Sequence, residues 1–202
     1  MHLDLKAFLL SGQFGPIAFG MSRQALEAVL GAPDTWGQHT DKAKATIWKY
    51  GSFEFYFGEK GDALWMIYTD DLDPMEGSHS LTLDPWLLNK ELEIQQAESL
   101  FASEQIPYKR VEQPKLERID LQMASGVVLH FDADEDRAKP TLCAIALMDK
   151  EYLQQSNPVK QISITVPLAV YEKLKHEAMT HKKSVSSLCS QWLIEYANQI
   201  SA

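Results

Sequence analysis

The chain has 202 residues, of which 45% are apolar, and this is enough for one large domain or two small domains with a real hydrophobic core. Its formal charge is −9, and residues 158–202 carry five lysines against three glutamates, which leaves −11 on residues 1–157. An acidic body of this kind repels nucleic acid and anionic membranes, so these partners are unfavourable for residues 1–157 and basic partners are favoured.

The start of the chain predicts an amphipathic helix. Residues 1–10 contain Asp4 and lack the long apolar centre of a signal peptide, and no run in the chain reaches the length of a membrane span. Cys143 and Cys189 are the only cysteines, and both fall in apolar patterns. Buried free thiols fit a reducing compartment, so we expect a cytoplasmic protein.

A short helix followed by an antiparallel sheet is predicted for residues 17–69. Ser22 is a good N-cap for a helix that runs through Leu30, and Gly31 with Pro33 ends that helix. Strands are expected next at residues 45–50, 52–57 and 63–69, the second of which alternates Phe with Glu and Tyr as a half-buried strand does.

This segment resembles the small α+β module of outer-membrane-assembly lipoproteins and β-lactamase inhibitor proteins. The resemblance implies a fold and nearly nothing about function. There is no lipid-attachment cysteine near the start, so an envelope role is not carried over. The residues that match are Gly20, Met21, Ser22, Leu30, Gly31, Pro33, Trp48 and Tyr50.

The pattern partly repeats after a polar, proline-containing connector at residues 70–86. Residues 88–105 are predicted to be a helix, and strands are predicted at 108–111, 118–123, 127–131 and 142–148. We therefore expect an α+β body over residues 1–150, with two related half-domains at 1–76 and 77–150 that share or abut their sheets. A polar linker is expected at 151–159.

The C-terminal segment, residues 160–202, predicts a strand followed by two helices. Residues 161–166 alternate apolar and polar side chains, and Pro167 suits the first turn of a helix. Apolar residues then recur at helical spacing on both sides of a polar turn at 180–183, and Ser184 is a plausible N-cap for the second helix.

This segment resembles the ribbon-helix-helix family of phage and methionine-type repressors. The resemblance implies a homodimer in which two strands pair into a ribbon that enters the major groove. It implies bases facing Gln161, Ser163 and Thr165, and phosphate held at the start of the second helix by Lys182, Lys183, Ser184, Val185 and Ser186. The implied dimer core consists of Ile162, Ile164, Val166, Leu174, Leu188 and Trp192.

Two features depart from this family. The polar face of the ribbon is neutral where many members carry a basic residue, and the net charge of +2 is low for a DNA-binding unit. A ribbon-helix-helix that only dimerises, or a tail that packs on its own body, remains open.

No catalytic or metal-binding motif is present. The acidic segments at 70–79 and 132–136 lack the spacing and the central glycine of a calcium loop, so we interpret them as solvated loops. No Gly-x-Ser-x-Gly motif, activated Cys/His pair or Gly-rich phosphate loop occurs, and His130 is predicted to be a surface or hydrogen-bonded histidine. We therefore expect no enzymatic activity, no metal and no cofactor.

The first half of the body is dense in aromatic residues. Most must be core, and those on the solvent face of the sheet are expected to form a patch for a protein partner. The sequence favours a dimeric regulator or antitoxin-like protein that binds operator DNA through its tail and a protein through its acidic body. The alternative is an immunity or inhibitor protein whose body occludes a toxin, with the tail serving only dimerisation.

Overall fold

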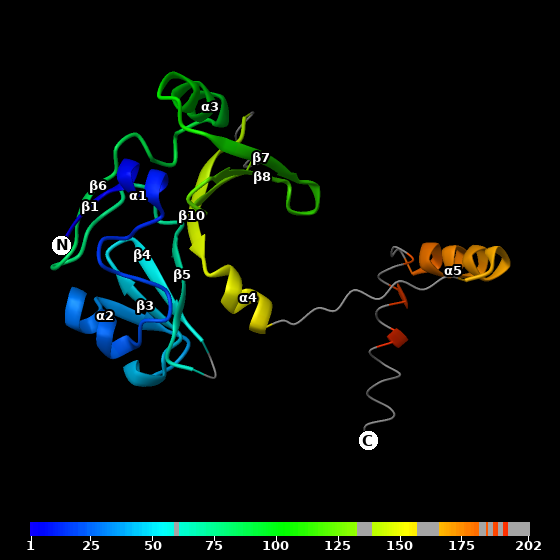
Figure 1. Cartoon of the computed structure of the whole chain (residues 1–202), viewed down its shortest axis with the longest axis horizontal. Helices are drawn as coiled ribbons and strands as arrows, with labels where there is room; N and C mark the ends of the chain where they lie inside the picture. Colours follow the sequence, from blue (N-terminus) through cyan, green and yellow to red (C-terminus); the bar gives the residue numbers. More distant parts are fainter. Residues whose placement is uncertain are drawn as a thin grey trace. The chain divides into compact units, whose positions relative to one another are not determined.

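The computed structural model describes residues 1–58, 61–132, 139–156 and 166–181, and residues 185, 188, 189, 192 and 193. Contacts within the chain divide it into two compact units, Met1–Pro158 and Val159–Ala202. We call the first the body and the second the C-terminal unit. The body has a mixed α+β fold, as predicted (Figure 1).

One eight-stranded antiparallel sheet forms the centre of the body. Its strand order is β2-β3-β4-β5-β10-β9-β8-β7. The strands are β2 (Thr35–Gly37), β3 (Ile47–Tyr50), β4 (Phe53–Phe57), β5 (Leu64–Thr69), β7 (Tyr108–Gln113), β8 (Arg118–Met123), β9 (Val128–Asp132) and β10 (Thr141–Met148).

The same chain order occurs twice in this sheet. Helix α2 (Arg23–Leu30) precedes strands β2 to β5, and helix α3 (Ile94–Ser103) precedes strands β7 to β10. The last strands of the two sets, β5 and β10, pair with each other in the middle, where Thr69 lies opposite Ile145 and Met66 opposite Met148. The backbone ladder is therefore continuous from one set of four strands to the other.

The core lies on one face of the sheet, because side chains alternate along each strand. Phe55 is fully buried, and its ring makes edge contacts with the rings of Phe14 and Tyr50 at centroid distances of 5.4 and 5.5 Å. Helices α1 (Leu5–Ser11), α2 and α3 add their apolar faces to the same cluster, including Phe8, Leu26 and Phe101. Each such aromatic or aliphatic side chain contributes about 1.5–3 kcal/mol when fully buried.

The start of the chain differs from the helix predicted over residues 1–10. His2–Asp4 form strand β1, which pairs in parallel with β6 (Thr82–Asp84), and the helix α1 begins only at Leu5. The Asp4 side chain accepts a hydrogen bond from the amide of Ala7 at 3.1 Å and so caps the helix. A distant pairing partner satisfies the backbone of the first residues, which periodicity within ten residues does not reveal.

Helix α3 is shorter than the helix predicted at 88–105. The Gln96 side chain accepts a hydrogen bond from the amide of Glu93 at 3.0 Å, which fixes the start of the helix. Leu88 and Leu92 precede it in irregular backbone but are still buried, so their apolar spacing imitates helical periodicity where no helix forms. Short 3-10 turns at Lys42–Lys44 and Pro114–Leu116 complete the connections.

Helix α4 (Lys150–Ser156) occupies most of the segment expected as a linker. The ring of Tyr152 stacks on the ring of Trp65 at a centroid distance of 5.3 Å and an interplanar angle of 14°. The first part of this segment is therefore ordered against strand β5.

In the C-terminal unit, helix α5 (Leu168–Thr180) follows Pro167. Residues 185, 188, 189, 192 and 193 also have helical backbone. In the described part of the chain, no helix combines the length and apolar character that crossing a membrane requires.

Candidate interaction surfaces

The predicted DNA-binding and dimer residues are only partly covered by the structure. Val166 and Leu174 are half-buried, Leu188 is 2% exposed, and Trp192 is 42% exposed. Val185 is half-buried and helical. The remaining predicted residues lie outside the described ranges: Gln161, Ile162, Ser163, Ile164, Thr165, Lys182, Lys183, Ser184 and Ser186.

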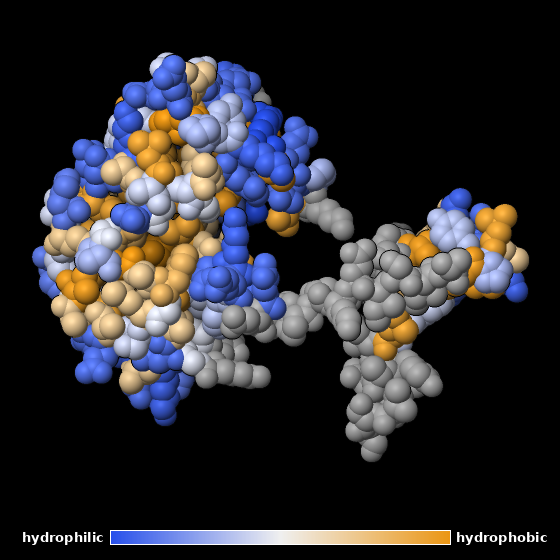
Figure 2. Space-filling view, viewed as in Figure 1, coloured by the Kyte–Doolittle hydropathy of each residue, from blue (hydrophilic) through white to orange (hydrophobic). Residues whose placement is uncertain are grey.

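Apolar side chains lie on the surface of the C-terminal unit. Leu168 and Met179, at the two ends of α5, are 74% and 70% exposed, and Val170 and Tyr171 are each more than 40% exposed. Figure 2 shows apolar residues on the surface of α5. Several large apolar side chains exposed on one helix are in keeping with a protein interface.

The body has a second surface, on the face of the sheet opposite the core. We call it the open face. The register of the strands places one row of side chains across all eight strands of this face. In strand order the row is Thr35, Lys49, Glu54, Tyr68, Ala146, Val128, Gln122 and Lys109.

Aromatic side chains gather on the open face of the first half. The Tyr56 ring makes edge contacts with the rings of Trp65 and Tyr68 at centroid distances of 6.1 and 6.3 Å. Met66 lies opposite Tyr56, and all four side chains are half-buried. We call Tyr56, Trp65, Met66 and Tyr68 the aromatic patch.

Carboxylates border the aromatic patch. The Tyr56 hydroxyl donates a hydrogen bond to Glu54 Oε2 at 2.6 Å. Burial, followed by the negative charge of Asp70, raises the pKa of Tyr68 to about 12, and burial together with Glu54 raises the pKa of Tyr56. Both phenols are therefore neutral at physiological pH, and the electrostatic potential around them is negative.

The open face of the second half carries an ionic cluster, defined as Arg118, Asp120 and His130. Asp120 is 3% exposed, and its Oδ1 lies 2.7 Å from His130 Nδ1. Arg118 Nε lies 2.9 Å from the same oxygen, within ion-pair distance, but makes no hydrogen bond to any described residue. Burial lowers the pKa of His130, against the opposing effect of Asp120, so a neutral imidazole donates its Nδ1–H to the carboxylate.

Cys143 lies beside this cluster but is not activated. Its thiol donates a weak hydrogen bond to the backbone oxygen of His130 at 3.3 Å. Burial, followed by the charge of Asp132, raises the pKa of the thiol to about 12. A thiol that stays protonated at neutral pH is a poor nucleophile.

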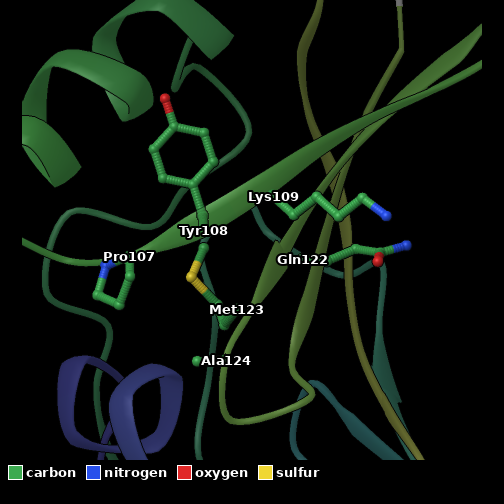
Figure 3. A pocket seen from close by; sticks show the side chains of 6 residues that line it. All are labelled: Pro107, Tyr108, Lys109, Gln122, Met123 and Ala124. Atoms are coloured by element: carbon green, nitrogen blue, oxygen red, sulfur yellow. The ribbon is translucent and has the colours of Figure 1, made fainter.

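A shallow hollow of about 290 Å³ lies between the start of strand β7 and the end of strand β8. Figure 3 shows the side chains of Lys109 and Gln122 extending side by side, with the Tyr108 ring directed away from them. Lys109 is the only charged side chain among the residues that line it, so the hollow lacks the convergent groups of a catalytic site. The full lining is Pro107, Tyr108, Lys109, Gln122, Met123 and Ala124.

The acidic segment at 70–79 is tied into ion pairs. Asp71 pairs with Lys49 at 3.2 Å, Asp73 pairs with Lys90, and His79 Nδ1 lies 3.1 Å from Asp34. Among the described residues, no group of three or more His, Cys, Asp or Glu side chains is placed to hold a metal ion. Of the acidic segment at 132–136, only Asp132 belongs to the described part.

Comparison with known proteins leaves the family open: no family model matches the chain, and no curated protein or solved structure is significantly similar to it. The resemblances to ribbon-helix-helix repressors and to the lipoprotein and inhibitor module therefore remain predictions.

The sequence pattern alone does not identify Asp120 as a member of the ionic cluster. Its pairing with His130 depends on the register of β8 against β9, which the turn at residues 124–127 sets. Asp120 and His130 both fall on the polar face of consecutive predicted strands, and this is the only indication of the pair in the sequence. The two residues are ten positions apart along the chain. Without the turn length, the sequence alone does not place them opposite each other.

Proposed function

We propose that the chain is a non-enzymatic binding protein that dimerises through its C-terminal unit and binds DNA as a ribbon-helix-helix regulator, while its acidic body binds a protein partner. The observation that carries the proposal is the exposed apolar surface of α5. A helix after Pro167 and further helical residues from 185 onward are in keeping with this architecture.

Size favours dimerisation. The C-terminal unit spans only residues 159–202, and a domain this small rarely stabilises itself with its own core. Among its described residues, Ala178 and Leu188 are the fully buried apolar side chains, whereas Leu168 and Met179 are largely exposed. A second copy of the same unit would cover these side chains and complete a shared core.

Solution mass tests the dimer. We expect the full chain, at 22.9 kDa, to sediment as a particle of twice that mass. Leu174→Glu places a charge at the predicted dimer core and should give a monomer, while Lys173→Glu, on the neighbouring exposed position, should leave the dimer intact. A wild-type monomer at micromolar concentration would overturn the proposal.

Selection from a random pool of DNA duplexes tests the DNA-binding part. We expect the wild-type chain to enrich one sequence, with affinity that falls steeply as salt rises. Changing Gln161 or Thr165 to alanine should relax this preference, whereas Glu195→Gln, which changes a residue outside the predicted base-facing and phosphate-binding sets, should keep it. Failure of the wild-type chain to enrich any sequence would leave a C-terminal unit that only dimerises.

A second candidate function is that of an immunity or inhibitor protein. The aromatic patch on the acidic body favours it, because half-buried aromatic side chains on a sheet face are typical interface anchors. In this case the Leu174→Glu chain should hold its partner as tightly as the wild-type chain does. Loss of partner binding in that variant would argue that the C-terminal unit takes part in capture.

A further inference from the structure

We propose that the aromatic patch binds an arginine or lysine side chain presented by a basic segment of a protein partner, with the cation seated against Tyr56 and Tyr68 and between Glu54 and Asp70. This inference rests on the partner-binding role proposed for the body and names the chemistry of that partner.

The two tyrosine rings and one carboxylate converge through strand register. Glu54 lies directly opposite Tyr68 across the β4–β5 pair, and its carboxylate accepts a hydrogen bond from the Tyr56 hydroxyl at 2.6 Å. The Tyr56 and Tyr68 rings meet at 89°, with centroids 6.3 Å apart. The rings meet edge to face and both side chains are half-buried, and the face of an aromatic ring attracts a cation.

The charges around the patch favour a cation. Glu54 and Asp70 both act on the Tyr56 and Tyr68 hydroxyls, as the raised phenol pKa values reflect. Lys49 is the cation on the adjacent strand, but its ammonium group pairs with Asp71 at 3.2 Å. Arg118, in the second half of the body, lowers the pKa of Tyr68, but this is the weakest of the effects on that pKa.

The residues around the aromatic patch limit which partner segments can bind there. Tyr152 of α4 stacks on Trp65 and closes one end of the patch. Toward the second half, the row continues through the small side chains of Ala146 and Val128. A net charge of −11 on residues 1–157 attracts a basic segment from a distance.

The test is a titration of the isotope-labelled full chain with a nine-residue arginine peptide, followed by NMR. We expect shifts concentrated on β4, β5 and the β10 residues next to Tyr68. Glu54→Gln should weaken binding by about tenfold, because it removes one of the two carboxylates that flank the cation. Tyr68→Leu should weaken it similarly without a change of charge.

Two control variants separate this site from diffuse attraction. Glu112→Gln makes the same change of charge on an exposed residue of β7, whose partner Ile119 belongs to the core face, and should change affinity less than twofold. Tyr56→Phe keeps the ring and releases the Glu54 carboxylate, so binding should persist. Equal losses for Glu54→Gln and Glu112→Gln, or shifts spread over the acidic surface, would overturn the inference.

The outcome is independent of the dimer. Sedimentation of the same variants reports on the C-terminal unit, which contains none of the substituted residues. A dimer that ignores the peptide would refute the cation site alone, and a monomer that binds it at β4 and β5 would refute only the proposed dimer.

Discussion

The two halves of the body share one chain order but differ in the chemistry of their open faces. In the first half, the open face presents Tyr56, Trp65 and Tyr68. In the second half, it presents a buried carboxylate held by His130 and Arg118. On the core face the halves agree, since Phe55 and Phe131 are both fully buried.

This contrast shows which positions the scaffold constrains. A helix and four strands need an apolar core face to stay together, so both halves place aromatic and aliphatic residues there. The open face carries no such requirement. The pair Lys49 and Glu54, on the middle strands of the first half, corresponds to Asp120 and His130 in the second, yet only the second pair is buried.

The largest expected effect tests whether the halves fold together. Phe55→Ala removes a fully buried ring that contacts Phe14 and Tyr50, and should cost about 3–5 kcal/mol of unfolding free energy. Because β5 and β10 share a ladder, the whole body should unfold in one transition at a lower urea concentration. Fluorescence and circular dichroism should give the same midpoint. Two separate transitions would show that each half is stable by itself.

The ionic cluster should matter more than an ion pair in the first half. Asp120→Asn leaves the Arg118 charge poorly compensated in a largely buried site, and should cost about 2 kcal/mol, a value reduced because Arg118 is partly exposed. Asp71→Asn removes the exposed partner of Lys49 and should cost less than about 0.5 kcal/mol. Urea denaturation of both variants provides the comparison. Similar losses would mean that burial adds nothing to the ionic cluster.

In the first half the sequence predicts helix α2 and strands β3 to β5, but not the short edge strand β2. Helix α2 was predicted from its Ser22 cap and its Gly31 stop, and strands β3 to β5 begin within two residues of their predicted starts. These signals are local, because caps, turns and alternation act within a few residues. At the start of the chain the predicted helix is confirmed only from Leu5 on, because β1 exists only through its pairing with β6, eighty residues later.

The open-face site was harder to predict for the same reason. The sequence indicates that the aromatic residues are candidates for a surface patch. It does not show which of them share the open face, because this depends on the bulge between Tyr56 and Phe57. The bulge brings Trp65 beside Tyr56. The ionic cluster depends on the register between two strands and on burial of polar groups. Neither the strand register nor this burial can be predicted from the spacing of residues along the chain.

Helix α4 links the two halves by a contact that should be weaker than either core. It continues from β10 of the second half, but its Tyr152 stacks on Trp65 of the first. Tyr152→Ala should cost about 1 kcal/mol and speed hydrogen exchange in α4. Leu153→Ala, on a side chain that is 39% exposed, should change both much less. Equal effects of the two variants would mean that the stacking does not hold the helix.

The smallest effect should appear only as a dependence on pH. Burial lowers the pKa of His130 in the folded body, so the unfolded chain takes up a proton at a higher pH than the folded chain does. Stability is therefore unaffected by His130 above about pH 6.5, the pKa of an exposed histidine, and falls as the pH drops below that value. His130→Asn keeps an N–H donor near Asp120 but cannot take up a proton. The slope of the urea midpoint between pH 7 and pH 5 should therefore be shallower for this variant than the wild-type slope. If His130→Asn keeps the wild-type slope, the acid sensitivity of the body does not come from the ionic cluster.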